Sequence, residues 1–299
     1  LFAADVTGQA GVIGEAIETL QQIAGLDFRT QNTIPDWLPL ARNRKRQAAA
    51  ETLDRVIRVI IHERRKTDAD KGDLLSMLLL SEDDSGTRMT DQEVRDEAVT
   101  LFAAGHETTS NALTWTWYLL SQHPEVEARL HAEVDVVLAG RAAMLSDLPN
   151  LPYTAMILKE SLRLYPPAWV LNARQAEAEV EIDGYRIPKG GYIFLAPYAV
   201  HRSPRYFEDP LRFDPNRFSP EQEKRIPRYA YFPFGGGPRV CIGNSFAMME
   251  AQLILATVAQ QFRLALLPDQ LVDIDPLITM APRYGLRMRT QARQVVGVS

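Results

Sequence analysis

The sequence predicts a mainly α-helical protein with a minor β part, and two observations carry this prediction. Long stretches before residue 140 lack proline and place apolar residues at helical spacing. After residue 165 prolines become frequent, and short runs of β-branched and aromatic residues alternate with turn residues. We find no internal repeat and no low-complexity linker, so one domain over residues 1–299 is expected. Its parts are a helical region (1–165), a β and irregular region (166–243), and a last helix with terminal strands (244–299).

The helical region contains two well-marked helices. The first is predicted over Glu51 to Arg65, which lacks Gly and Pro and carries an apolar stripe at helical spacing. After a polar loop at 81–90, Thr90 and Glu93 form a capping box, which predicts the start of a long helix. That helix is expected to run from Asp91 to Gln122, roughly 48 Å at 1.5 Å per residue. Pro124 closes it.

The remaining elements follow from prolines, turn residues and alternation. Helices are predicted at about 124–138, 153–165 and 244–262, and short strands at 264–267 and 284–290. Asp183-Gly184 lies between two alternating apolar runs and predicts a hairpin over 180–187. Residues 201–240 lack a period, but their aromatic residues favour a packed segment; these are Phe213, Phe218, Tyr229, Tyr231, Phe232 and Phe234.

Composition excludes several classes of protein. The 299 residues carry 33 Lys+Arg and 38 Asp+Glu, a net charge of −5, with 46% hydrophobic residues. A disordered chain, a collagen-like repeat and a strongly basic nucleic-acid binder are therefore excluded. The single cysteine excludes a disulfide framework and a Cys-rich zinc site, and favours a reducing compartment.

Hydropathy gives no run of about 18 uncharged apolar residues, so a membrane association is not expected and a cytoplasmic location is predicted. The first residues, Leu1-Phe-Ala-Ala-Asp5, have no initiator Met and resemble the middle of an element. We therefore expect an N-terminal truncation, with which an anchor or signal would have been lost.

The single cysteine lies in Phe234-Gly-Gly-Gly-Pro-Arg-Val-Cys-Ile-Gly243. A lone cysteine is commonly a small buried hydrophobe, and that alternative stays open from composition alone. Three glycines allow close backbone approach, and the following helix N-terminus favours an anionic sulfur. One thiolate without a neighbouring Cys or His suits a metal whose other ligands come from elsewhere, as in haem.

This loop resembles that of the cytochrome P450 family of haem-thiolate monooxygenases, and the resemblance extends over essentially the whole chain. It implies the C-terminal two thirds of a P450 fold of bacterial type. Cys241 then matches the ligand of the iron in haem b (iron protoporphyrin IX). Arg239 matches a haem propionate contact and Arg174 a second one, although either arginine could be an ordinary solvated side chain. The resemblance also assigns five small or apolar residues to haem contact: Phe234, Gly235, Gly243, Gly105 and Ala104.

A second motif, Ala104-Gly-His-Glu-Thr-Thr109, lies midway along the long predicted helix. Its bland interpretation is a polar patch on a helix face. Glycine costs about 1 kcal/mol in a helix interior and so suggests a packing or functional reason. In the resembled family Thr108 matches the alcohol that contacts dioxygen and Glu107 the acid that admits protons. His106 falls at a variable position and is not expected to be a ligand.

A third motif is Glu160-Ser-Leu-Arg163, whose charged residues share one helix face. One alternative is an ordinary surface ion pair worth ~0–1 kcal/mol. The neighbouring leucines at 158, 162 and 164 instead suggest a partly buried pair, which needs further hydrogen-bonding partners. In the resembled family this pair is joined by a downstream arginine, matched here by Arg217, and the three are architectural. Where a common family version has Glu immediately before that arginine, this sequence has Asn216.

The resemblance implies reductive activation of O2 and oxidation of a lipophilic organic substrate. Substrate contacts are expected at Phe102, Ala103, Val170, Leu171, Ile278 and Thr279. Gly235–Gly237 do not follow a dinucleotide pattern, so electrons are expected from a ferredoxin, a flavodoxin-type protein or a reductase. A basic docking face for that partner is predicted from Lys224, Arg225, Arg228 and Arg239.

Three rival functions stay open. A haem-thiolate peroxygenase would use peroxide, and a haem-thiolate isomerase would need no oxygen source; the Glu107-Thr108 pair argues against both. The third rival, from a different class, is a haem-free non-catalytic remnant. Retention of haem would separate that remnant from the enzymes.

Overall fold

A computed structural model describes residues 2, 8, 10–30, 34–67 and 70–293. The chain divides into two compact units, Leu1–Glu107 and Thr108–Ser299, and each is described by itself. The predicted fold class is confirmed, because helices hold about half of the described residues and the strands among these residues form only small sheets. The single domain over 1–299 stays a prediction.

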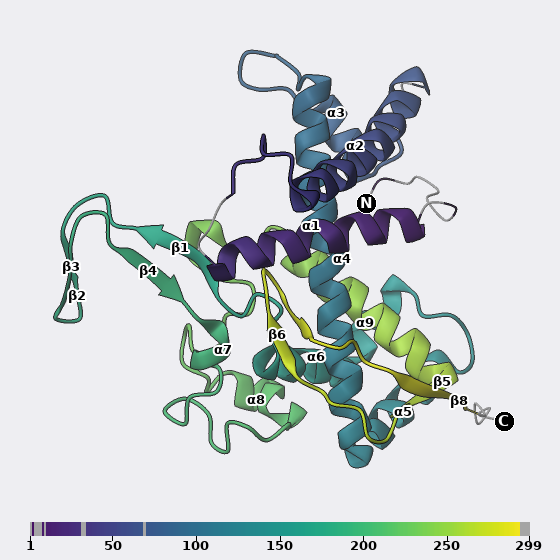
Figure 1. Ribbon diagram of the computed structural model, residues 1–299. Helices are drawn as coiled ribbons and strands as arrows, with labels where there is room; N and C mark the ends of the chain where they lie inside the picture. The colour runs from purple at the N-terminus through teal and green to yellow at the C-terminus, as the bar shows by residue number, and fades with distance from the viewer. Residues whose placement is uncertain (1, 3–7, 9, 31–33, 68–69, 294–299) are drawn as a thin grey trace. The chain divides into compact units, whose positions relative to one another are not determined.

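The first unit is helical. It holds α1 (Ala10–Thr30), α2 (Ala41–Thr67), α3 (Leu74–Leu80) and the first part of α4 (Asp91–Gln122) (Figure 1). Helix α2 begins ten residues before the predicted start, because the apolar stripe marks only its packed face while a polar, proline-free first turn still favours helix. The apolar stripe packs against α3 and α4, with the side chains of Ile57, Ile61, Leu75, Leu79, Val94 and Ala98 buried.

The capping box at the start of α4 is confirmed. The amide of Thr90 donates to Glu93 Oε2 at 2.8 Å, and the amide of Glu93 donates to Thr90 Oγ1 at 3.3 Å. The helix then runs from Asp91 to Gln122, as the absence of proline predicts. It is the one element that enters both compact units.

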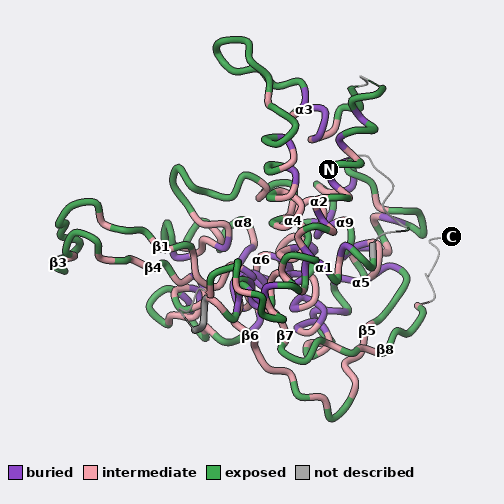
Figure 2. Tube along the Cα trace, turned by 45° about the horizontal axis from the view of Figure 1, so that its top comes forward, coloured by how far each residue is buried: buried purple, intermediate pink, exposed green. Residues whose placement is uncertain are grey.

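The second unit has its core between four helices. The C-terminal part of α4 packs with α5 (Pro124–Leu138), α6 (Pro152–Leu164) and α9 (Asn244–Gln261). The bounds of α5, α6 and α9 agree with the predicted bounds to within one residue. Figure 2 shows buried positions concentrated on these helices. Apolar side chains that are at most 1% exposed there include those of Leu120, Leu130, Val134, Leu138, Ile157, Leu158, Leu255, Ala256 and Ala259.

Within its described residues, the second unit also has four two-stranded antiparallel sheets. They pair β1 (Leu171–Gln175) with β4 (Tyr192–Leu195), β2 (Val180–Ile182) with β3 (Tyr185–Ile187), β5 (Phe262–Leu266) with β8 (Met288–Ala292), and β6 (Ile274–Pro276) with β7 (Met280–Pro282). The predicted hairpin is confirmed: Asp183 and Gly184 both have positive φ, 48° and 79°, as a type I′ turn requires. The terminal strands differ from their predicted bounds, since the register pairs Phe262 with Ala292.

Residues 201–240 contain only short helical turns after α7 (Pro197–Val200): η3 (Pro215–Phe218), α8 (Pro220–Glu223) and η4 (Gly237–Arg239). A further turn, η2 (Leu145–Asn150), precedes α6. The expected packing of the aromatic residues holds for Phe213 and Phe218, which are buried. It fails for Tyr229, which is 53% exposed because its ring lies over the backbone of Gly236 at the surface.

Candidate functional site

The cysteine loop connects the irregular segment to α9, and backbone hydrogen bonds define its shape. The amide of Cys241 donates to the carbonyl of Phe234 at 2.9 Å, and the amide of Gly235 donates to Phe232 O at 3.0 Å. Gly235 and Gly237 have φ of 76° and 67°, a region that favours glycine. Gly243 then caps α9. The loop therefore folds back on itself and presents Cys241 immediately before a helix N-terminus.

The thiol of Cys241 is exposed. Its neighbour Val240 is 45% exposed and Ile242 is 92% exposed. The small buried hydrophobe considered for Cys241 is therefore wrong. Exposed apolar side chains beside an exposed thiol form a surface that an apolar ligand would cover.

Close packing explains one glycine of the loop. A Cβ at Gly236 would lie 2.7 Å from Tyr229 Cε1, closer than side chains tolerate. A Cβ at Gly235 would meet Leu171 Cδ1 at 3.5 Å. This places Leu171, at the start of β1, beside the half-buried Phe234-Gly235 end of the loop.

The two arginines expected at haem propionates are both exposed and lie in the second unit. Arg174, on β1, donates to the carbonyl of Asn172 at 2.8 Å. Neither Arg174 nor Arg239 makes an ion pair with any residue that the structure describes. Both guanidinium groups are thus available for a carboxylate ligand.

Glu160 and Arg163 on α6 form a fully buried ion pair, with both side chains 0% exposed. Arg163 Nε and Nη2 donate to the two carboxylate oxygens at 2.7 and 2.8 Å. The amide of Asp214 donates to Glu160 Oε1 at 2.9 Å, and Arg217 Nε lies 3.4 Å from the same oxygen. The surface ion pair considered for these residues is therefore wrong.

Arg163 also joins α6 to the irregular segment. Its guanidinium donates to the carbonyls of His201 (2.8 Å), Pro210 (2.7 Å) and Arg212 (3.0 Å). Burial raises the pKa of Glu160 above its ordinary value, while Arg163, the Asp214 amide and Arg217 oppose that shift. Asn216, the departure from the resembled pattern, donates to Asp214 Oδ1 at 2.8 Å.

The motif on α4 falls across the boundary between the two units, after Glu107. In the first unit Ala104 is exposed, and Ala103, Gly105 and Glu107 are half-buried. Phe102 stacks on Phe2 at 6.4 Å and on the exposed His106 at 6.1 Å between ring centroids. In the second unit Thr108 is half-buried. These residues lie on consecutive positions of one helix, and their roles stay predictions.

Two segments expected to touch substrate lie side by side in the second unit. Trp169 Nε1 donates to Leu277 O at 2.9 Å, and the amide of Met280 donates to Pro167 O at 2.9 Å. Val170 and Ile278 are thereby brought near one another, Val170 half-buried and Ile278 48% exposed.

Thr279 is instead a link to α4. Its hydroxyl accepts from Asn111 Nδ2 at 3.0 Å, and the residue is 8% exposed. Asn111 and Trp169 were missed by the sequence analysis. A Trp beside the Pro166-Pro167 stop was the available signal for Trp169, whereas nothing local marked Asn111.

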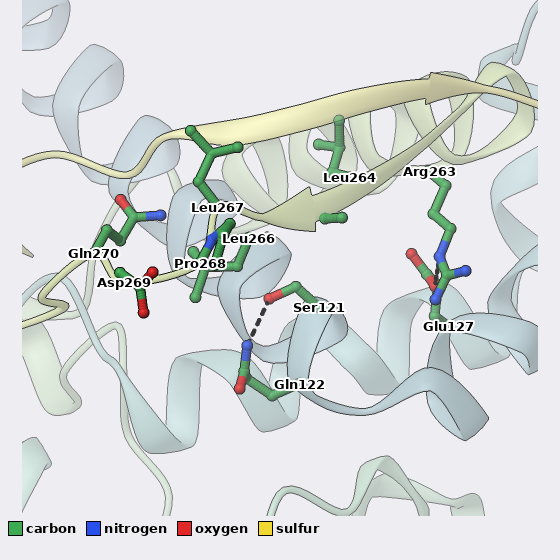
Figure 3. Close-up of a pocket in the computed structure, with 11 residues that line it drawn as sticks. Ser121, Gln122, Glu127, Arg263, Leu264, Leu266, Leu267, Pro268, Asp269 and Gln270 are labelled. Carbon is green, nitrogen blue, oxygen red and sulfur yellow. Dashed lines mark hydrogen bonds and ion pairs between the residues drawn. The ribbon is translucent and has the colours of Figure 1, made fainter.

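A surface pocket of about 280 Å³ lies elsewhere in the second unit, between the end of α4, the start of α5 and β5 (Figure 3). Glu127 pairs with Arg263 there at 2.8 Å, and burial raises the pKa of Glu127. The pocket is lined by Ser121, Gln122, Glu127 and residues 263–270, none of which was predicted as a site residue.

The donor set of the cysteine loop fits haem. Haem needs a thiolate on iron, apolar surface for its ring and cations for its propionates. Cys241, the exposed Val240 and Ile242, and the unpaired Arg174 and Arg239 offer these chemical groups. Among the described residues no cluster of three or more His, Cys, Asp or Glu could hold a metal ion by itself.

Comparison with known proteins gives a consistent result. A family model described as Cytochrome P450 matches residues 12–287. Cyclooctatin synthase of Streptomyces melanosporofaciens is 44% identical over 245 residues, 81% of this chain and 53% of the relative. Pentalenene oxygenase of Streptomyces avermitilis is 41% identical over 256 residues, 86% of this chain and 57% of the relative. The chain spans about half the length of these curated relatives.

Solved structures agree with this. The heme domain of cytochrome P450DA superposes with a TM-score of 0.83 at 32% identity, covering 94% of this chain and 61% of that one. Cyanobacterial CYP120A1 with bound retinoic acid gives a TM-score of 0.85 at 30% identity, covering 94% of this chain and 63% of that one.

Among helices of the described residues, none combines the length and apolarity needed to cross a bilayer.

Proposed function

The chain belongs to the cytochrome P450 family, and from this premise we propose that it carries the haem-thiolate centre of a monooxygenase that oxidises a lipophilic organic substrate with O2. The observation that carries the proposal is the exposed thiol of Cys241 on a glycine loop closed by the Cys241–Phe234 backbone hydrogen bond. A cytoplasmic location stays a prediction.

Cys241 would hold the iron of haem b, and Arg239 and Arg174 would pair with the propionates. The resemblance assigns ring contact to Phe234, Gly235 and Gly243 of the second unit and, separately, to Ala104 and Gly105 of the first unit. Haem held there by Cys241 would supply the chemistry for reductive activation of O2. On this side the chain presents the sulfur immediately before the N-terminus of α9, whose backbone amides favour a negatively charged ligand.

Glu107 and Thr108 would manage protons. Both lie half-buried at consecutive positions of α4. A carboxylate can take up a proton from water, and an adjacent hydroxyl can donate one at Oγ1 while accepting another. We assign the proton-admitting role to Glu107 and the donating role to Thr108.

The resemblance assigns substrate contact to Phe102 and Ala103 of the first unit and, separately, to the segments 170–171 and 278–279 of the second unit. Val170 and Leu171 are half-buried and Ile278 is exposed, so apolar surface is present for a lipophilic compound. Thr279 would act mainly by tethering this segment to Asn111. Pentalenene is a rational first probe, because one relative is named for its oxygenation.

Electrons would come from a ferredoxin, a flavodoxin-type protein or a reductase. Lys224, Arg225 and Arg228 are exposed, and none of them pairs with a carboxylate of the described chain. These three side chains offer a basic surface to an acidic partner, which acts mainly on the encounter rate, while Arg239 is assigned to a propionate. Charge reversal at Arg225 and Arg228 should slow reduction and weaken its salt dependence. Arg289→Glu, at an exposed arginine on β8, is the matched control.

The experiment that tests the central proposal is a reduced, carbon-monoxide difference spectrum of the 299-residue chain reconstituted with haem. A thiolate-type Soret band that is lost in Cys241→Ser establishes the haem and its ligand together. A wild-type chain that retains no haem would overturn the proposal for this chain and favour the haem-free remnant.

A further inference from the structure

His201 is a buried histidine between the Glu160–Arg163 pair and the segment that leads to Cys241. It follows α7 directly and is 0% exposed. Its backbone carbonyl accepts from Arg163 Nη1 at 2.8 Å. Its ring nitrogen Nε2 accepts from the amide of Phe232 at 2.9 Å. One residue thus contacts both the α6 arginine and the backbone before the cysteine loop.

The hydrogen bond to Phe232 determines the tautomer of the ring. Because Nε2 accepts a hydrogen bond, the proton of the neutral imidazole lies on Nδ1. Nδ1 has no hydrogen-bond partner of normal geometry within the described residues. The backbone groups of Arg163 and Leu162 nevertheless act to raise the pKa of the ring, which means that they stabilise its protonated form. Burial and the nearby Arg163 lower the pKa of His201 to about 3, so Nε2 stays an acceptor at neutral pH.

Further backbone hydrogen bonds lie between Phe232 and the amide of Cys241. The carbonyl of Phe232 accepts from Gly235, and the carbonyl of Phe234 accepts from Cys241. Next to them, Tyr231 Oη donates to Lys159 O at 3.0 Å, which ties the same stretch to α6. The His201 ring packs against Tyr231 and Phe232, with centroid separations of 5.2 and 5.3 Å.

We propose that His201 is a positioning residue for the haem thiolate, which it aligns by fixing the Phe232 amide at the root of the cysteine loop. The inference rests on the proposed haem-thiolate function. Without the acceptor, the half-buried Phe232 amide would lose its hydrogen-bond partner, and the loop would gain alternative conformations. A thiol in those conformations binds iron less often as the thiolate.

Three variants separate this role from simple packing. His201→Phe keeps a ring of similar size against Tyr231 and Phe232 but removes the acceptor. His201→Gln supplies a side-chain oxygen that can accept from the Phe232 amide and serves as the rescue. His123→Phe is the matched control, because His123 also packs against a ring, that of Phe213 at 5.1 Å, and bonds a backbone carbonyl within the same unit.

The first readout is the share of thiolate-type signal in the reduced, carbon-monoxide spectrum at equal haem content. His201→Phe should lose most of that share, whereas His201→Gln and His123→Phe should keep it. The same share in His201→Phe as in wild type would overturn the proposal, as would an equal loss in His123→Phe.

The second readout needs no haem, namely amide hydrogen exchange over residues 231–241 in the apo chain. His201→Phe should exchange there about tenfold faster than wild type, and His201→Gln should restore the protection. Unchanged exchange in His201→Phe would also overturn the proposal. If wild type shows no thiolate band but His201→Phe still accelerates exchange, the haem function fails while the role of His201 in holding the loop stands.

Discussion

Arg163 and Glu160 are bonded through both carboxylate oxygens in a place from which solvent is excluded, and the same guanidinium binds three carbonyls of the segment 201–212. All five N–H groups of this arginine face protein oxygens. The pair is therefore a joint between α6 and the irregular segment that ends in the cysteine loop. Its main effect is to hold the carbonyls of that segment in one arrangement against α6.

Removal of the arginine should destabilise the second unit strongly. Arg163→Met leaves the Glu160 carboxylate buried without its counter-charge and leaves three carbonyls without their hydrogen-bond donor. The free energy of unfolding should therefore fall by about 3–5 kcal/mol. The control is Arg186→Met, whose side chain and its partner Glu179 are 75% and 52% exposed; its cost should be about 0–1 kcal/mol. Urea denaturation compares the two, and equal losses would contradict the joint.

Acidification should destabilise the chain through His201. Its pKa of about 3 in the folded chain lies below the ordinary value of 6.5, so only the unfolded chain binds this proton between these values. Stability from this group is present above pH 6.5 and is lost as the pH falls, by about 1.4 kcal/mol per pH unit. The difference between wild type and His201→Gln in urea denaturation at several pH values isolates this slope. A difference that does not change with pH would refute it.

Gly236→Ala should strain the cysteine loop through one neighbour. The new Cβ would meet Tyr229 Cε1 at 2.7 Å, and displacing that ring should cost about 1–2 kcal/mol. Tyr229→Ala removes the obstacle, so the double variant should lose less than the sum of the single losses. Additive losses in thermal unfolding would show that the contact is not the cause.

The Asn111–Thr279 hydrogen bond should couple α4 to the predicted substrate segment. In a cycle of Asn111→Ala and Thr279→Val, the coupling energy should be about 1 kcal/mol. Thr114→Val is the control on the same helix, since Thr114 Oγ1 bonds only Ser110 O within α4; paired with Thr279→Val it should be additive. A coupling near zero for Asn111 would mean that the bond does not tether the segment.

Local signals in the sequence were sufficient for most secondary structure. Each of these signals acts within a few residues: the capping box of Thr90 and Glu93, Pro124 after Gln122, Pro166-Pro167 after Tyr165, and the Asp183-Gly184 turn. Such effects depend on the chain's own neighbours, so they survive any tertiary arrangement. The loop around Cys241 and its resemblance to the P450 family were likewise available from the sequence.

Only the tertiary structure decided which groups meet. Asn111 reaches Thr279 across 168 residues, and the ring of His201 reaches the Phe232 amide across 31. It also decided that Cys241 is exposed while Glu160 and Arg163 are fully buried, which reverses what a lone cysteine and a charged i,i+3 pair ordinarily indicate. The physical reason is that burial and hydrogen-bond partners are set by packing between distant segments, which residue type and local spacing do not determine by themselves.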